Sequence, residues 1–208
     1  MKNKNKIDFE QLFKLSTETN LEWPRRARVI YNPTESTEYK VLDKLVQEFQ
    51  PPKNSKLVDF GCGTGRALFY FHYYWNIKSI GIELMDEAFD ILETNYDNYL
   101  SKINELKIPH QDLYIFQTFA EHFEIENDVN IFYFFNPFSP RIFQAVLNNI
   151  LTSFLNYPRD LYIILYYPDR KYLEYLSNKT QFKLYKNIDI NSKEDNRERV
   201  LIFKKSAN

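Results

Sequence analysis

The chain has 208 residues, of which 44% are hydrophobic and 26% charged, with a net charge of −1 at pH 7. This composition is that of an ordinary globular protein, long enough for one compact domain and a modest extension. Near-neutral charge removes the electrostatic case for duplex nucleic acid as an obligatory partner, although a structured RNA or a protein partner stays open.

The cysteine content and the apolar runs indicate the compartment. A single cysteine cannot form an internal disulfide, which is typical of a reducing compartment. The first residues are basic, but no apolar core follows them, as a secretory signal would require. The most apolar runs, 131–135 and 161–167, are far shorter than the roughly 20 residues that span a bilayer. We therefore expect a soluble, cytoplasmic protein with no membrane partner.

In chain order, the pattern predicts a helical extension over 1–50 and then an α/β domain over 51–208. The extension contains an amphipathic helix near 8–18 and a second helix over 35–49, which two prolines end. In the domain, apolar runs alternate with helical patterns. Strands are expected over 56–60, 79–83, 113–116, 129–135 and 161–167, and helices over 65–75, 86–99 and 140–155.

Continuous apolar strands separated by helices predict a parallel sheet covered on both faces, with a ligand crevice at the carboxyl ends of the strands. The tail differs, because the strands expected over 182–190 and 199–205 are joined only by 191–198. That connection has no room for a crossover helix, so the last strand must be antiparallel.

Three of the four glycines lie close together in "VDFGCGTGR" (58–66), at Gly61, Gly63 and Gly65. Glycine permits positive φ and lets a ligand lie against the backbone. The helix that follows points its free N–H groups at the same position. The dinucleotide fingerprint would need a glycine where the chain has Arg66. The loop therefore predicts a docking edge for a nucleotide-sized ligand of another kind.

The pattern Asp59-x-Gly61-x-Gly63-x-Gly65, between a buried strand and a helix, resembles motif I of the class I S-adenosylmethionine (SAM)-dependent methyltransferases. The similarity extends over about 31–205. It implies SAM as cofactor and a Rossmann-like, doubly wound sheet of seven strands, mostly parallel, with an antiparallel last strand. Glu83, at the end of the next strand, would accept hydrogen bonds from both ribose hydroxyls.

The same resemblance implies further cofactor contacts. Leu84 would pack on the adenine. Family members commonly bind the adenine amino group with an acid, whose position here falls at Phe119. The ring of Phe119 and the backbone of Phe119 and Ala120 would then substitute, unless the register is shifted by two and Glu121 serves. Cys62 occupies a slot for small residues beside the cofactor, and no base lies nearby to make it a nucleophile.

The stretch "FFNPFSP" (134–140) resembles the Asn-Pro-Pro-aromatic motif of amino-group methyltransferases, without the second proline. By this resemblance Asn136 is the catalytic candidate: it accepts the N–H of the acceptor and lies against the cofactor. Pro137 and Phe138 would contact the substrate, with the ring of Phe138 stacked on it. Asn-Pro is also a common turn-former, so a structural role for this NPF motif (136–138) stays open.

Upstream, "YNPTES" (31–36) occurs in the predicted extension. Methyltransferases with such extensions often fold this kind of segment over the methionine end of SAM as a lid. Tyr31, Thr34 and Thr37 would offer hydroxyls there. Alternatively, Thr34 or Ser36 caps the helix that follows.

Two other features of the sequence bear on possible ligands. The segment "WPRRAR" (23–28) has three arginines beside a tryptophan, which fits either a phosphate-rich or acidic partner or a solvated face. The three histidines have no metal-ligand spacing, so we expect no metal site.

Taken together, these motifs predict an enzyme that transfers a methyl group from SAM to an unidentified small molecule, protein or RNA, with nitrogen as the expected acceptor atom. Displacement at an already activated methyl group needs alignment more than acid–base machinery. Two alternatives stay open, a non-catalytic SAM-binding domain and an NAD-dependent oxidoreductase. No motif indicates the acceptor or the oligomeric state.

Overall fold

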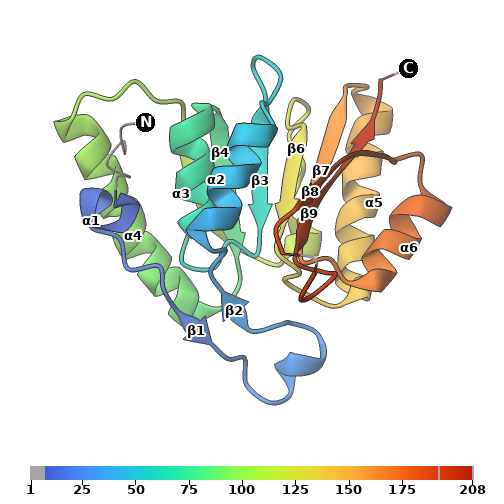
Figure 1. Ribbon diagram of the computed structural model, residues 1–208, viewed down its shortest axis with the longest axis horizontal. Helices are drawn as coiled ribbons and strands as arrows, with labels where there is room; N and C mark the ends of the chain where they lie inside the picture. Colours follow the sequence, from blue (N-terminus) through green and yellow to red (C-terminus); the bar gives the residue numbers. More distant parts are fainter. Residues whose placement is uncertain (1–7, 192, 208) are drawn as a thin grey trace.

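The computed structural model describes residues 8–191 and 193–207. Within them a seven-stranded sheet has the order β5-β4-β3-β6-β7-β9-β8. It forms the centre of the molecule (Figure 1). Its strands are β3 (Lys56–Phe60), β4 (Lys78–Glu83), β5 (Leu113–Gln117), β6 (Ile131–Phe134), β7 (Leu161–Tyr166), β8 (Lys183–Asp189) and β9 (Arg199–Lys205). Strands β3 to β7 pair in parallel, and β9 pairs antiparallel with both β7 and β8. The predicted Rossmann-like sheet with an antiparallel last strand is confirmed.

Helices cover both faces of the sheet (Figure 1). Helices α2 (Tyr39–Glu48), α3 (Arg66–Trp75) and α4 (Asp86–Glu105) lie on one face, and α5 (Pro140–Asn156) and α6 (Arg170–Lys179) on the other. Alternate residues of each strand enter opposite cores: in β3, Leu57 faces the α2–α4 side, and Val58 and Phe60 face the α5–α6 side. This double burial explains the unbroken apolar runs of the sequence. No helix in the described part of the chain is long and apolar enough to cross a bilayer.

Four helices differ from the prediction. Helix α4 extends to Glu105, six residues beyond its predicted end. Helix α1 (Phe9–Phe13) is shorter, because it ends at Lys14, whose φ is +54°. Helix α2 begins at Tyr39 rather than at 35. Helix α6 was not predicted. It begins after the N-cap Asp169, whose side chain accepts the N–H of Lys171.

Between α1 and α2 the chain passes along the edge of the sheet where the parallel strands end (Figure 1). This segment, residues 20–35, is called the strap below. It contains β1 (Asn20–Leu21), the short 3₁₀ helix η1 (Ala27–Val29) and β2 (Thr34–Glu35). Because β1 and β2 pair antiparallel, the two ends of the strap lie side by side.

Candidate active site at the carboxyl edge of the sheet

The glycine loop, residues 61–65, joins the carboxyl end of β3 to α3. Gly61, Gly63 and Gly65 have φ values of +73°, +55° and +95°, in the region that other residues enter only with strain. A Cβ at Gly61 would lie 2.4 Å from the Cβ of Pro137, and one at Gly63 would lie 2.7 Å from the Cγ2 of Thr34. The NPF motif and the strap therefore lie directly on the loop backbone. At Gly65 a Cβ would clash with side chains of α3 and α4, so this glycine serves helix packing.

Glu83, the last residue of β4, faces the glycine loop. One carboxylate oxygen accepts the N–H of Gly63 at 2.9 Å, and the other accepts the N–H groups of Leu84 and Met85 at 2.8 Å. The side chain is 5% exposed. Burial raises the pKa of the Glu83 carboxyl, and the three backbone hydrogen bonds oppose that rise. The carboxylate thus forms the base of the crevice and also holds the loop in position.

Asp59 lies on β3 just before the loop and is 2% exposed. Its Oδ2 has no hydrogen-bond partner among the described residues. Burial, together with the charge of Glu83, raises the pKa of Asp59 well above its ordinary value. An unpartnered carboxylate oxygen, a second carboxylate and a backbone cradle fit a ligand that carries positive charge. SAM, with its sulfonium and its ammonium group, is such a ligand.

The NPF motif follows β6, and its polar atoms have unequal surroundings. The carbonyl of Asn136 accepts the side-chain amide of Asn32 at 2.6 Å, and that of Pro137 accepts the N–H of Asn32 at 3.1 Å. The carbonyl of Phe138 accepts the hydroxyl of Tyr172. The side-chain Oδ1 of Asn136 is buried and has no partner among the described residues. The motif therefore has one buried oxygen free to accept a hydrogen bond.

The strap closes over this region. Tyr31 forms a β-bridge with Phe138, and the N–H of Ser139 donates to the carbonyl of Ile30 at 2.6 Å. The ring of Trp23 stacks on Tyr31 with centroids 4.5 Å apart. The crevice left between strap, glycine loop and NPF motif has a volume of about 50 Å³. Pockets for small molecules commonly measure roughly 300–1,000 Å³.

Most of the predicted site residues meet at this crevice. Those that line it are Tyr31, Thr34, Gly61, Glu83, Leu84, Ala120, Pro137 and Phe138. Phe119 does not line it: its side chain is 43% exposed and lies against His122. Glu121, the alternative to Phe119, has one buried oxygen without a partner in the described residues. Burial raises the pKa of Tyr31, and the charge of Glu121 raises it further.

Four predicted positions, Asp59, Gly63, Gly65 and Asn136, belong to β3, the glycine loop or the NPF motif and do not line the crevice. Two further positions, Cys62 and Thr37, have other contacts. The side chain of Cys62 packs toward Gly81 and does not line the crevice. Burial and the carboxylates of Asp59 and Glu83 raise the pKa of its thiol, which disfavours a reactive thiolate. Thr37 is buried and bonds the hydroxyl of Tyr133 at 2.9 Å, so it offers nothing to the crevice.

Helix α2 is capped differently from either alternative in the sequence. Its N-cap is Glu38, which makes no side-chain capping bond. The hydroxyl of Ser36 instead donates to the carbonyl of Thr17. Neither Thr34 nor Ser36 caps the helix.

The sequence-based prediction missed Asn32 and Glu35, which also line the crevice. One signal was available, because the dipeptide Asn-Pro occurs at 32–33 and again at 136–137. In the fold these two dipeptides meet. Within the described residues, no group of three or more His, Cys, Asp or Glu side chains is arranged to hold a metal ion.

Fold and site together define a class I SAM-dependent methyltransferase. A family model described as "Histone methylation protein DOT1" matches residues 30–155, more than half of the chain. The chain therefore belongs to the DOT1 family, and its cofactor is SAM. Among curated proteins, no sequence matches it.

Solved structures share the fold at low sequence identity. An RNA methyltransferase from Salinibacter ruber in complex with S-adenosyl-L-homocysteine (SAH) aligns with a TM-score of 0.53 and 16% identity, over 81% of this chain and 91% of that one. A TehB-like SAM-dependent methyltransferase from Corynebacterium glutamicum gives 0.54 and 13%, over 82% and 89%. An rRNA methylase from Streptococcus thermophilus gives 0.50 and 15%, over 79% and 93%.

Proposed function

We propose that this enzyme methylates a nitrogen atom, and that Asn136 orients the acceptor. The observation that carries the proposal is the buried Oδ1 of Asn136, which lacks a partner among the described residues although the three neighbouring carbonyls are engaged. Leaving such an oxygen unsatisfied costs about 1–3 kcal/mol. A ligand N–H that donates to it would remove that cost.

The residues of the crevice suit this chemistry. When bound, SAM supplies a methyl group already activated by a positive sulfonium. An acceptor nitrogen that donates its N–H to Asn136 keeps its lone pair for attack and has its orientation set by that bond. The rings of Tyr31, Phe135 and Phe138 line the crevice next to Asn136, which favours a planar acceptor group and excludes water.

The cofactor would be held by Asp59, Glu83 and the glycine loop, with Leu84 and Ala120 beside the adenine. A carboxylate has about four acceptor sites, and three backbone N–H groups already use three of those on Glu83. Two ribose hydroxyls would therefore compete with the N–H of Gly63. For this reason we infer that the glycine loop adjusts when SAM binds.

We further propose that the strap is the lid of the cofactor site. Thr34 of the strap lies on Gly63, and the crevice of about 50 Å³ is too narrow for an adenosyl group. Within the predicted extension over 1–50, only the strap would move, because α1 and α2 contribute buried core residues such as Phe13 and Leu42. Residues 1–7 lie outside the described part of the chain.

The test is methyl transfer from labelled SAM into cell-lysate fractions of protein, RNA and small molecules. The description of the family model names histone methylation, and two of the similar structures are RNA methylating enzymes, so macromolecular fractions come first. We expect label in one fraction, N-methyl groups in the digested product, and loss of label with Asn136→Ala while SAH affinity is retained.

Three outcomes would count against the proposal. Undiminished transfer by Asn136→Ala would reduce the NPF motif to a structural turn. O-methyl or C-methyl products would exclude nitrogen as the acceptor atom. Firm SAH binding without label in any fraction would favour a non-catalytic SAM-binding domain.

A further inference from the structure

Asn32 connects the strap to the NPF motif through both its side chain and its backbone. Its amide donates to the carbonyl of Asn136 at 2.6 Å, and its N–H donates to the carbonyl of Pro137 at 3.1 Å. With the Tyr31–Phe138 bridge, these bonds form what we call the clasp. Asn32 and Asn136 are 104 positions apart in the chain. The clasp is thus a direct link between the segment over the cofactor site and the motif that faces the acceptor.

The clasp acts on the conformation of Asn136. The φ of Asn136 is +43°, a left-handed value that asparagine tolerates better than most residues but that still requires support from its surroundings. The bond from Asn32 fixes the peptide plane that follows Asn136. With φ and this plane both set, the direction of the Cα–Cβ bond of Asn136 is set as well, which limits the positions that the unpartnered Oδ1 can reach.

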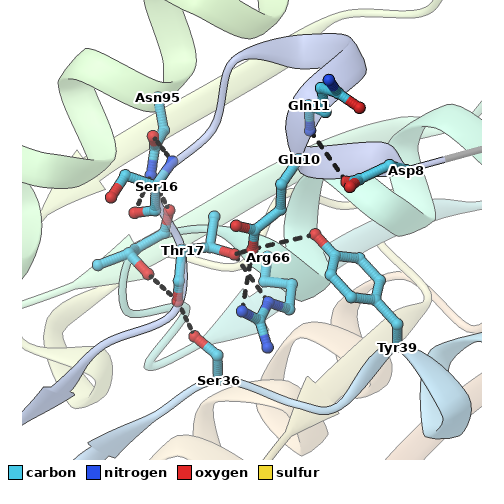
Figure 2. Close-up of polar contacts among 10 residues, drawn as sticks. Asp8, Glu10, Gln11, Ser16, Thr17, Ser36, Tyr39, Arg66 and Asn95 are labelled. Atoms are coloured by element: carbon cyan, nitrogen blue, oxygen red, sulfur yellow. Dashed lines mark hydrogen bonds and ion pairs between the residues drawn. The ribbon is translucent and has the colours of Figure 1, made fainter.

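The base of the strap, where its two ends lie side by side, is held in a different way (Figure 2). The guanidinium of Arg66, a residue only 9% exposed, donates to Glu10 at 2.9 Å and to the hydroxyl of Thr17 at 2.7 Å. The carbonyl of Thr17 accepts from the hydroxyls of Ser36 and Thr64. We call this cluster of Glu10, Thr17, Ser36, Thr64 and Arg66 the neck.

The neck and the clasp differ in strength. The neck includes a largely buried ion pair, and it ties both ends of the strap to the glycine loop and the start of α3. The clasp consists of neutral hydrogen bonds, which are the weaker kind. A strap that opens to admit SAM therefore breaks the clasp and turns about the neck.

We propose that Asn32 is a positioning residue for methyl transfer, which holds Asn136 in its acceptor-binding conformation only while the strap is closed. This inference rests on the proposed function of Asn136. Cofactor entry opens the strap and releases Asn136, and closure over SAM restores it. The acceptor site is then incomplete while the strap is open, which keeps an acceptor from binding during cofactor entry.

The experiment compares Asn32→Asp, Asn136→Ala and the double variant, with Asn98→Ala as a matched control. Asp keeps the size of Asn32 but cannot donate to the carbonyl of Asn136. Asn98 also donates its amide to a backbone carbonyl, that of Lys14, and does not line the crevice. In the lysate fraction that accepts label, we expect Asn32→Asp to lower kcat by about 10- to 100-fold, with SAH affinity unchanged.

Because Asn32 acts through Asn136, the double variant should be no slower than Asn136→Ala alone. Additive losses would show that Asn32 acts elsewhere and would overturn the proposal. A higher kcat in Asn32→Asp would mean that the clasp inhibits. Loss of SAH binding would make Asn32 a cofactor residue. Each of these results contradicts the positioning role.

A readout without acceptor separates this inference from the proposed function. Arg25, Arg26 and Arg28 are exposed on the strap, so trypsin cleavage there reports opening. Asn32→Asp should be cleaved several-fold faster than Asn98→Ala, even if methyl transfer to nitrogen is disproved. Equal cleavage rates would show that the Asn32 bonds do not hold the strap closed.

Discussion

The N–H of Gly63 donates to the carboxylate of Glu83 at 2.9 Å, joining the glycine loop after β3 to the end of β4. The two residues are 20 positions apart, and the parallel pairing of β3 with β4 brings their strands to the same edge of the sheet. This bond contributes to both the shape of the loop and the direction of the acid. Changes at either residue should therefore affect cofactor binding and loop stability together.

Replacing Glu83 with glutamine should weaken SAM and SAH binding by about 1.5–3 kcal/mol, the range for a hydrogen bond to a charged group. The amide removes the charge and cannot accept N–H bonds on both of its terminal atoms. Isothermal calorimetry measures the affinities. Glu87→Gln, on the exposed first turn of α4, is the control. Unchanged SAH affinity would mean that Glu83 only holds the loop.

Asp59→Asn should stabilise the protein at alkaline pH. Because the pKa of Asp59 is raised in the folded state, folding binds protons, and stability falls as pH rises above the unfolded value of about 3.9. The variant lacks this penalty, so its free energy of unfolding at pH 8 should exceed that of wild type by about 1–2 kcal/mol. The difference in the free energy of unfolding between the variant and wild type should become smaller toward pH 4. Asp59→Asn should also bind SAH more weakly than wild type.

Urea unfolding at pH 4.5 and pH 8 measures this difference, and the exposed Asp90→Asn serves as control. Burial lowers the pKa of His72, so its contribution to stability changes with pH in the opposite direction to that of Asp59. Comparing the variant with wild type at the same pH cancels this contribution, because both proteins contain His72. An Asp59→Asn protein that is less stable than wild type at pH 8 would show that the carboxylate is well partnered.

Gly63→Ala should destabilise the protein and displace the strap. Its φ of +55° strains any residue with a Cβ, at a cost of about 1–3 kcal/mol. The added methyl would also lie 2.7 Å from the Cγ2 of Thr34. Thr34→Ser removes that Cγ2, so in this background Gly63→Ala should cost less, and the strap should resist trypsin better. If Gly63→Ala destabilises the protein equally with and without Thr34→Ser, the contact with the Cγ2 of Thr34 is not a cause of the destabilisation.

Arg66→Met should loosen the neck of the strap. The variant loses the ion pair with Glu10 and the bond to Thr17, which lie in a largely buried setting, and we expect a loss of about 1–3 kcal/mol. Trypsin should then cut the strap faster. Arg170→Met is the matched control, because its ion pair with Glu174 is exposed and should be worth little. Equal losses in the two variants would contradict the role of the neck.

Much of the fold was predictable from local pattern. The predicted bounds of β3 and β9 match the structure, since an apolar run ended by glycine or by charged residues has few alternatives. Helix α6 was missed, because only Tyr172 and Leu176 of its ten residues are buried and six of the others are polar or charged. Helix α1 was predicted too long, because residues after Lys14 bond to α3 and α4 instead of continuing the helix.

The site was predictable to a similar degree. The glycine loop and Glu83 are adjacent along a strand–loop–helix–strand unit, so their meeting follows from right-handed connection of parallel strands. Phe119 was assigned by spacing alone, and its side chain lies outside the crevice. Asn32 was overlooked, because the repeated Asn-Pro dipeptide does not by itself indicate that its two copies, 104 positions apart, meet in the fold.

The sequence alone determined the parallel sheet, its antiparallel last strand and the backbone cradle, because burial and glycine's freedom at positive φ are properties of short segments. Only the tertiary structure decided that the strap lies on the glycine loop, that Asn32 bonds to Asn136, and that Arg66 bonds to Glu10 and Thr17 in the neck. These three contacts join residues that are far apart in the chain. They depend on which distant carbonyl and carboxylate groups come within hydrogen-bonding distance, and that is set only when the whole chain is packed.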